Sequence, residues 1–69
     1  MNGFSGTAFR MEESIKAKLV ELEAFSQISA VTIQDANLDA QEQNWLDYVA
    51  GGLFAKVKKT GDKRYYTSR

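Results

Sequence analysis

The run LFAKVKKTGDKRYYT, residues 53–67, carries the strongest local folding signal of the chain. Two segments with aliphatic and aromatic residues, 53–58 and 63–67, flank a polar loop at 59–62. This loop length is typical of a hairpin, and Gly61 supplies a residue that adopts a positive φ without strain. The sequence therefore predicts that the chain ends in an antiparallel β-hairpin.

A helix is predicted directly before this hairpin, over residues 38–50. Asn37 or Asp39 can act as its N-cap, Glu42 lies in its first turn, and the pair Gly51-Gly52 is typical of a helix end. The helical period places Leu38, Leu46, Val49 and Leu53 on a core side, Trp45 and Ala50 near its edges, and Gln41, Asn44 and Tyr48 on the outer side.

Two further elements are predicted upstream. Residues 11–25 have apolar side chains at helical spacing, namely Met11, Ile15, Leu19, Leu22 and Phe25. Residues 28–34 are rich in β-branched side chains and predict a short strand that is buried or half-buried. Residues 34–37 then predict a turn or one short helical turn, because Asp and Asn readily bond to their own backbone.

The remaining residues, 1–10, show no apolar period and predict a flexible lead-in. Residues 11–69 then form a single α+β domain in the order helix, strand, helix, hairpin. The chain has 69 residues, 43% of them hydrophobic, which is close to the lower size limit for a self-sufficient core.

Composition excludes most enzyme classes. The chain has no Cys and no His, so it lacks disulfides, thiolate zinc sites and Ser-His or Cys-His catalysis. Neighbouring carboxylates such as Glu12-Glu13 face different sides of a helix, and Ser14 and Lys18 match a Ser-Lys dyad in spacing only. We predict no enzymatic activity, no cofactor and no metal.

Membrane and export signals are missing from the sequence. No apolar run approaches the roughly 18 residues of a membrane span. The first residues have neither the basic nor the apolar region of a signal peptide. We expect a cytoplasmic protein with no membrane partner.

Charge is unevenly distributed although the formal net charge is zero. Residues 1–50 hold three Lys or Arg against eight Asp or Glu, a net charge of −5, whereas residues 51–69 hold six against one, a net charge of +5. Basic residues on the hairpin can displace counterions from a phosphate backbone, and a tyrosine hydroxyl can bond a phosphate oxygen. Alternatively, Lys on an edge strand prevents sheet-to-sheet pairing while a tyrosine packs inward. The candidate phosphate contacts are Lys56, Lys58, Lys59, Lys63, Arg64 and Tyr66.

Residues 45–66, WLDYVAGGLFAKVKKTGDKRYY, resemble the C-terminal half of winged helix-turn-helix domains. In that family a recognition helix ends in a Gly-Leu-aliphatic step and leads into a basic two-stranded wing closed by tyrosines. Residues 31–35 resemble the family's short strand and the start of helix two, and residues 11–25 would serve as helix one. The resemblance implies a DNA-binding, transcription-regulatory module with Gln41, Asn44 and Tyr48 as candidate groove contacts; outward Gln and Asn are also common as solvated surface residues.

The sequence departs from this family in two ways. Helix two has room for about one turn only, at residues 33–37, and the expected recognition helix carries Asp39, Glu42 and Asp47 but no Lys or Arg. A second function therefore stays open: a homodimeric adaptor or structural subunit, for instance of phage or mobile-element origin. In that case Trp45 and Tyr48 would anchor a protein interface, unless Trp45 closes the core.

Overall fold

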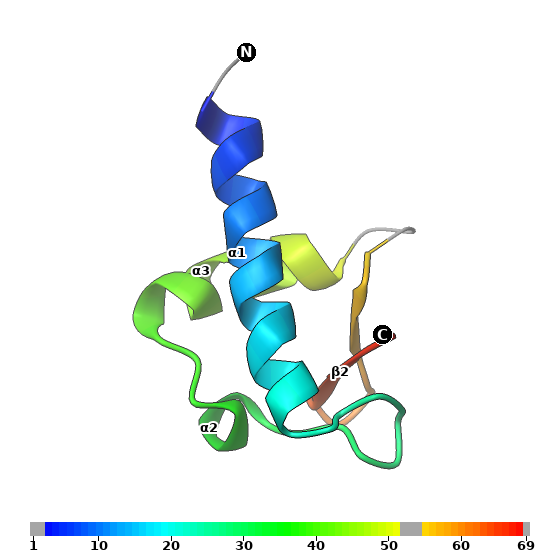
Figure 1. The fold of residues 1–69 in the computed structure, drawn as a ribbon. Coiled ribbons are helices and arrows are strands. Elements are labelled where there is room, and N and C mark those ends of the chain that lie inside the picture. Colours follow the sequence, from blue (N-terminus) through cyan, green and yellow to red (C-terminus); the bar gives the residue numbers. More distant parts are fainter. Residues whose placement is uncertain (1–2, 52–54, 69) are drawn as a thin grey trace.

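The computed structural model describes residues 3–51 and 55–68 and shows three helices followed by a two-stranded antiparallel hairpin. The helices are α1 (Gly3–Glu21), α2 (Ile33–Ala36) and α3 (Ala40–Ala50), and the strands are β1 (Val57–Lys59) and β2 (Tyr65–Thr67). Figure 1 shows α1 as the longest element, with α3 crossing it and the hairpin beside it. The predicted α+β class and the C-terminal hairpin are confirmed, whereas the predicted order of helix, strand, helix and hairpin is observed as three helices and a hairpin. Leu53 lies outside the described residues.

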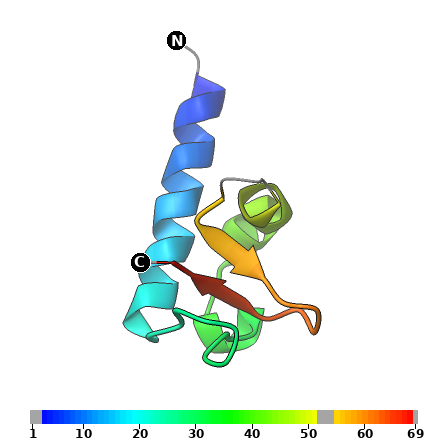
Figure 2. The same cartoon turned by 90° about the vertical axis from the view of Figure 1, so that its right-hand side faces the viewer.

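Helix α1 begins at Gly3, well before the start that the apolar period predicted at Met11. Residues 3–10 are helical instead of forming an irregular lead-in, and in both views these turns project beyond the rest of the domain (Figures 1 and 2). Phe9 on this projecting part is 60% exposed. An apolar period reports burial, so a helical segment whose large apolar side chain is exposed, as Phe9 is, need not show such a period.

Helix α1 ends at Glu21, four residues before the end of the helical spacing at Phe25. Glu23 has a φ of 57°, its amide bonds Val20 O at 2.9 Å, and the amide of Ala24 bonds Leu19 O at 3.0 Å. This pattern is the Schellman end of a helix, here with Glu in the position that glycine usually occupies. Leu22, expected on the core stripe, consequently lies past the helix end and is 45% exposed.

The predicted strand over residues 28–34 is reduced to a single bridge residue. Val31 pairs with Tyr65 through two backbone hydrogen bonds, Val31 N to Tyr65 O at 2.9 Å and Tyr65 N to Val31 O at 2.7 Å. Upstream, the Ser29 hydroxyl accepts hydrogen bonds from the amides of Phe25 and Ser26 and holds a tight turn. Ile28 in that turn is 97% exposed, so the prediction that it is buried is wrong. Its β-branched side chain favours a strand, but the serine turn determines the backbone here.

Helices α2 and α3 begin and end largely as the local sequence predicts. The Thr32 side chain caps α2, and Asn37, with a φ of 59°, ends it after one turn. Asp39 is the N-cap of α3 and forms a capping box with Glu42, so Asp39 and not Asn37 starts this helix. Gly51 ends α3 with a φ of −97°. A residue with a side chain does not fit at this position, because its Cβ would lie 2.7 Å from Asp47 O.

The hairpin confirms the prediction for the C-terminal run, with shorter strands. Val57 pairs with Thr67, Lys58 with Tyr66, and Lys59 with Tyr65. Because Val31 bridges the other side of Tyr65, β2 lies between β1 and the Val31 segment. Figure 2 shows the hairpin crossing in front of the helices with its tip directed away from α1.

The core lies where both long helices meet the inner face of the hairpin. Val57 and Thr67 are fully buried there, and Tyr65 is nearly so. Trp45 is half-buried and packs against this core, at its edge as predicted. The buried apolar side chains of this core cluster, among the described residues, are Ile15, Leu19, Ala24, Ala36, Leu38, Leu46, Val49, Val57 and Tyr65.

Candidate nucleic-acid interface

The hairpin register places basic and aromatic side chains on its outer face. Residues paired across two strands share a face, so Lys58 and Tyr66 lie side by side on the face opposite to the buried pair Val57 and Thr67. Lys58 and Tyr66 are both half-buried, and Tyr66 also packs against the core. Lys56, Lys59, Lys63 and Arg64 are exposed around this pair.

The base of the hairpin is tied to the rest of the domain. The Thr67 hydroxyl donates a hydrogen bond to Lys56 O at 3.0 Å, and the amide of Ser68 bonds the same oxygen at 3.2 Å. The amide of Thr67 bonds Ala24 O in the loop after α1 at 2.9 Å. The hairpin is therefore a fixed platform for its basic side chains.

The hairpin tip is a three-residue loop in which Lys63, and not Gly61, adopts the left-handed conformation. Lys63 has a φ of 64°, and no described glycine has a positive φ. The amide of Lys63 bonds Thr60 O at 3.2 Å, and the amide of Thr60 bonds Arg64 O at 2.8 Å. This is a turn followed by a bulge, whose last position favours glycine. The prediction of a positive φ at Gly61 is wrong by two positions.

Asp62 holds the tip together and partly neutralises it. The Thr60 hydroxyl donates a hydrogen bond to the Asp62 carboxylate, and Arg64 Nε lies 3.4 Å from the other carboxylate oxygen. The hydrogen bond from Thr60, helped by the Asp62 amide and the charge of Arg64, outweighs slight desolvation and lowers the pKa of Asp62. Of the predicted phosphate contacts, Arg64 is thus the one with an anionic partner in its own hairpin.

The hairpin lysines keep their charge unpaired. Across residues 3–51 and 55–68, the ion pairs within 4.0 Å are Lys18 with Glu42 and Arg64 with Asp62. Neither pair includes Lys56, Lys58, Lys59 or Lys63. These ammonium groups are therefore available to an external anion.

The outer face of α3 carries the predicted groove contacts but lies apart from the hairpin. Gln41, Asn44 and Tyr48 are exposed as expected, with Tyr48 at 60%. The ring of Tyr48 meets Trp45 edge to face, with centroids 5.5 Å apart. Successive residues of a helix are rotated by about 100° around its axis, so these three side chains form one strip along α3. Gln43 lies on a different side of the helix, rotated by about 160° from Gln41. The structure does not show this strip joining the hairpin in one surface.

Gln43 and Asp47 occupy the side of α3 that faces the hairpin. Burial raises the pKa of Tyr65 on β2, and the negative charge of Asp47 raises it further. Gln43 lines a hollow of about 420 Å³ together with Lys63 at the hairpin tip. This contact between helix and hairpin was not predicted, because it depends on the tertiary placement of α3.

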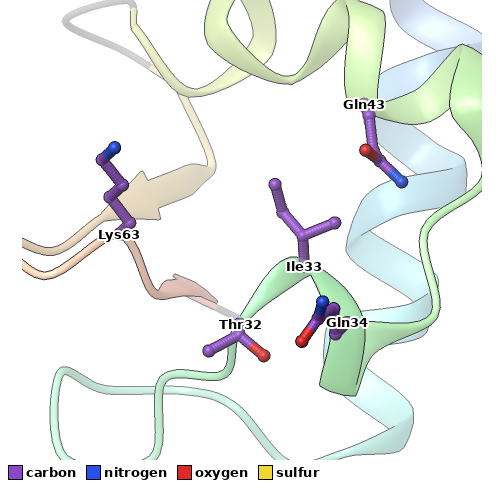
Figure 3. A pocket seen from close by; sticks show the side chains of 5 residues that line it. All are labelled: Thr32, Ile33, Gln34, Gln43 and Lys63. Atoms are coloured by element: carbon purple, nitrogen blue, oxygen red, sulfur yellow. The ribbon is translucent and has the colours of Figure 1, made fainter.

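The hollow, lined by Thr32, Ile33, Gln34, Gln43 and Lys63, opens between α2, α3 and the hairpin tip. Figure 3 shows Ile33 extending into the space between Lys63 and Gln43, with Thr32 and Gln34 at its base. Gln43 Nε2 donates a hydrogen bond to Leu38 O at 2.9 Å, which fixes its amide. The hollow thus combines an apolar wall with two amides and one ammonium group.

A second group of polar side chains, Ser14, Lys18 and Glu42, joins α1 to α3. We call it the Glu42 cluster. Lys18 Nζ lies 2.6 Å from Glu42 Oε1, the Ser14 hydroxyl donates to Glu42 Oε2, and Lys18 Nζ also donates to Asn37 O at 3.0 Å. Glu42 is 2% exposed. The spacing of Ser14 and Lys18 was noticed in the sequence, but their shared partner lies on another helix.

The bonds within the Glu42 cluster give it a structural role. Burial alone would raise the pKa of Glu42, but hydrogen bonds from Lys18, Ser14 and the Asp39 amide, together with the charge of Lys18, lower it. The Ser14 hydroxyl and the Lys18 ammonium are both held by the carboxylate.

The described part of the chain has neither a metal-binding cluster nor a membrane-spanning helix. No group of three or more acidic side chains there is arranged to hold a metal ion. Within the same residues, no helix is both long and apolar enough to cross a membrane.

Comparison with protein-family models, with curated proteins and with solved structures found no match to this chain. Its function must therefore be inferred from the geometry of its own residues.

Proposed function

We propose that this chain is a small nucleic-acid-binding module that contacts phosphates through its C-terminal hairpin. The observation that carries the proposal is the set of four lysines, Lys56, Lys58, Lys59 and Lys63, whose charges have no carboxylate partner among the described residues. They lie on a hairpin that is anchored at its base to the loop after α1. A fixed array of cations attracts a polyanion by releasing its condensed counterions.

The strand topology supports a reduced winged-helix architecture for this module. Val31 pairs with β2 ahead of α2, so a short first strand, two helices and a two-stranded wing follow each other after α1. This is the order that the resemblance of residues 31–67 implies. Helix α2 has one turn, which fits the short segment available to it.

The acidic character of α3 indicates that the hairpin leads the contact. Helix α3 carries Glu42 and Asp47 and begins after Asp39, without a Lys or Arg. Insertion into a major groove would bring the exposed carboxylates Asp39 and Asp47 close to two phosphate strands. Phosphate contacts through the hairpin avoid this repulsion.

Salt dependence tests the proposal directly. Four to five phosphate contacts on a short duplex give a slope of about −4 in log K against log salt. Fluorescence anisotropy should therefore show a loss of affinity of roughly 200-fold between about 50 and about 200 mM salt. A flat salt response would contradict the proposal.

The double variant Lys58→Gln with Lys59→Gln locates the contact. Each lost phosphate contact lowers affinity about tenfold near 0.1 M salt, so the pair lowers it on the order of 100-fold and makes the slope shallower by about 2. Lys16→Gln is the matched control, because it removes a positive charge from α1, where the sequence is acidic. Equal losses in hairpin and control variants would mean that only net charge matters.

A protein partner is the second candidate, and exposed apolar side chains favour it. Tyr48 is 60% exposed on α3, and Phe9 is 60% exposed on the projecting part of α1. Large exposed aromatic side chains are enriched at interface centres. Light scattering at several protein concentrations tests self-association: a dimer that Tyr48→Ser or Phe9→Ser dissolves supports this candidate, and a monomer at all concentrations removes its homodimeric form.

A further inference from the structure

We infer that the hollow between α2, α3 and the hairpin tip receives one unstacked base of a single-stranded nucleic acid. The inference rests on the proposed function, because the hairpin lysines would hold the phosphates of the same strand. It adds two points to the proposed function: the ligand is a single strand rather than a duplex, and the hollow is a subsite that recognises a base.

The size and lining of the hollow fit a nucleobase. Its volume is about 420 Å³, and Ile33 supplies an apolar wall between Lys63 and the amide of Gln43 (Figure 3). A base is flat and apolar on its faces and carries donors and acceptors on its edge. Binding sites for such groups are typically concave and apolar with a few placed polar side chains.

Gln43 is held in place before any ligand arrives. Its Nε2 atom donates to Leu38 O at 2.9 Å, and Leu38 is itself buried. The amide oxygen remains to accept a hydrogen bond from a base edge, and Figure 3 shows it turned toward the hairpin side of the hollow. A polar group that is already fixed loses less conformational freedom on binding.

Lys63 is the second observation that points to a ligand here. It occupies the bulge position with a φ of 64°, where glycine is the favoured residue. Its side chain forms the hairpin wall of the hollow. Because Lys63 lines the hollow from the hairpin, its ammonium group can hold the phosphate next to the bound base.

A single strand fits this site better than a duplex. A base can enter the hollow only when it leaves its stack, which costs least in a strand that is not paired. Asp47 lies on the same side of α3 and is exposed, so it would repel the second phosphate strand of a duplex. The lysines on the other side of the hollow need only one strand.

Abasic oligonucleotides separate base binding from phosphate binding. A single-stranded DNA and the same strand with abasic sites at alternate positions carry equal phosphate charge. With the base in the hollow, the abasic strand loses one hydrogen bond and the contact with Ile33, so anisotropy should show about tenfold weaker binding of that strand. A strand containing 2-aminopurine should also gain fluorescence on binding, because no aromatic side chain among the described residues lines the hollow to quench an unstacked base.

Variants of the hollow connect this effect to named residues. Gln43→Ala should reduce the preference for the intact strand from about tenfold to about twofold. Gln34→Ala should act in the same direction without affecting the bond to Leu38 O. Gln27→Ala is the matched control, since it removes the same side chain from an exposed position in the loop after α1, outside the hollow, and it should leave the preference unchanged.

The outcomes distinguish this inference from the proposed function. Equal binding of intact and abasic strands, with affinity still lost in Lys58→Gln with Lys59→Gln, would overturn the base site and leave the hairpin contact standing. Tighter binding to duplex than to single strand at equal salt would also overturn it. Failure of the wild-type chain to bind either form at low salt would overturn both.

Discussion

Positive charge serves different purposes in the two halves of the domain. Lys18 on α1 is satisfied internally: it bonds a carboxylate that is 2% exposed and lies 2.6 Å from Glu42 Oε1. Lys58 and Lys59 on β1 carry the same chemical group but lack a carboxylate within 4.0 Å among the described residues. Because the side-chain type is the same, the pairing state separates a lysine that stabilises the fold from one that is available for a ligand.

The largest expected effect is on the Glu42 cluster. Glu42→Ala removes the acceptor of Lys18 and Ser14 and one half of the capping box of α3. We expect the free energy of unfolding to fall by about 3 kcal/mol, as for other broken buried ion pairs. Urea denaturation followed by circular dichroism measures this loss.

The matched control for that variant is Glu21→Ala, which removes an exposed carboxylate from the end of α1. It should change stability by less than about 0.5 kcal/mol. Equal effects of Glu42→Ala and Glu21→Ala would mean that the cluster does not stabilise the junction of α1 and α3.

The same substitution at two lysines sharpens the comparison. Lys18→Gln leaves the buried Glu42 carboxylate without its cation, and we expect a loss of about 2 kcal/mol in the free energy of unfolding. Lys59→Gln should change it by less than about 0.5 kcal/mol, because its ammonium group has no partner to leave behind. Thermal unfolding of both variants measures these changes. A strongly destabilised Lys59→Gln would contradict the distinction between the paired lysine on α1 and the unpaired lysine on β1.

Acid should weaken the Glu42 cluster. The pKa of Glu42 is lowered below its ordinary value of 4.5, so the folded state favours the ionised form. Its contribution to stability is complete above about pH 4.5 and is lost as the pH falls through the lowered pKa. Glu42→Gln cannot titrate, so the stability difference between wild type and this variant should shrink with falling pH. A difference that stays constant down to the acid transition would contradict the lowered pKa.

Sequence patterns predicted the elements whose signals are local. Asp39 and Gly51 bound α3 as expected, and the hairpin lies where strand and turn residues alternate. Residues 3–10 were missed because they have no apolar stripe, although they are helical. The exposure of Ile28 was not predicted, because its β-branched side chain favours a strand whereas the Ser29 hydroxyl holds the backbone in a turn. A single sequence gives only a weak signal for such a turn.

The candidate site was predictable in composition but not in geometry. The basic residues of the hairpin were identified from charge counting alone; Lys56, Lys59, Lys63 and Arg64 are exposed, whereas Lys58 is half-buried. The hollow was not, because Gln43 and Lys63 are far apart in sequence and line the same hollow only through the packing of α3 against the hairpin. The partner of Ser14 and Lys18 was also not predicted, because Glu42 lies on a different helix and meets them only in the folded domain.

The smallest expected effect is the most discriminating one, because stability and binding should change in opposite directions. Lys63→Gly relieves a positive φ of 64° at a non-glycine residue, and we expect the free energy of unfolding to rise by about 1 kcal/mol. The variant also loses the ammonium group at the wall of the hollow, so affinity for a single strand should fall about tenfold near 0.1 M salt. Lys63→Asn is the companion, since Asn tolerates this conformation but carries no charge. A Lys63→Gly domain that is more stable and binds as well as wild type would show that the strained lysine serves no ligand.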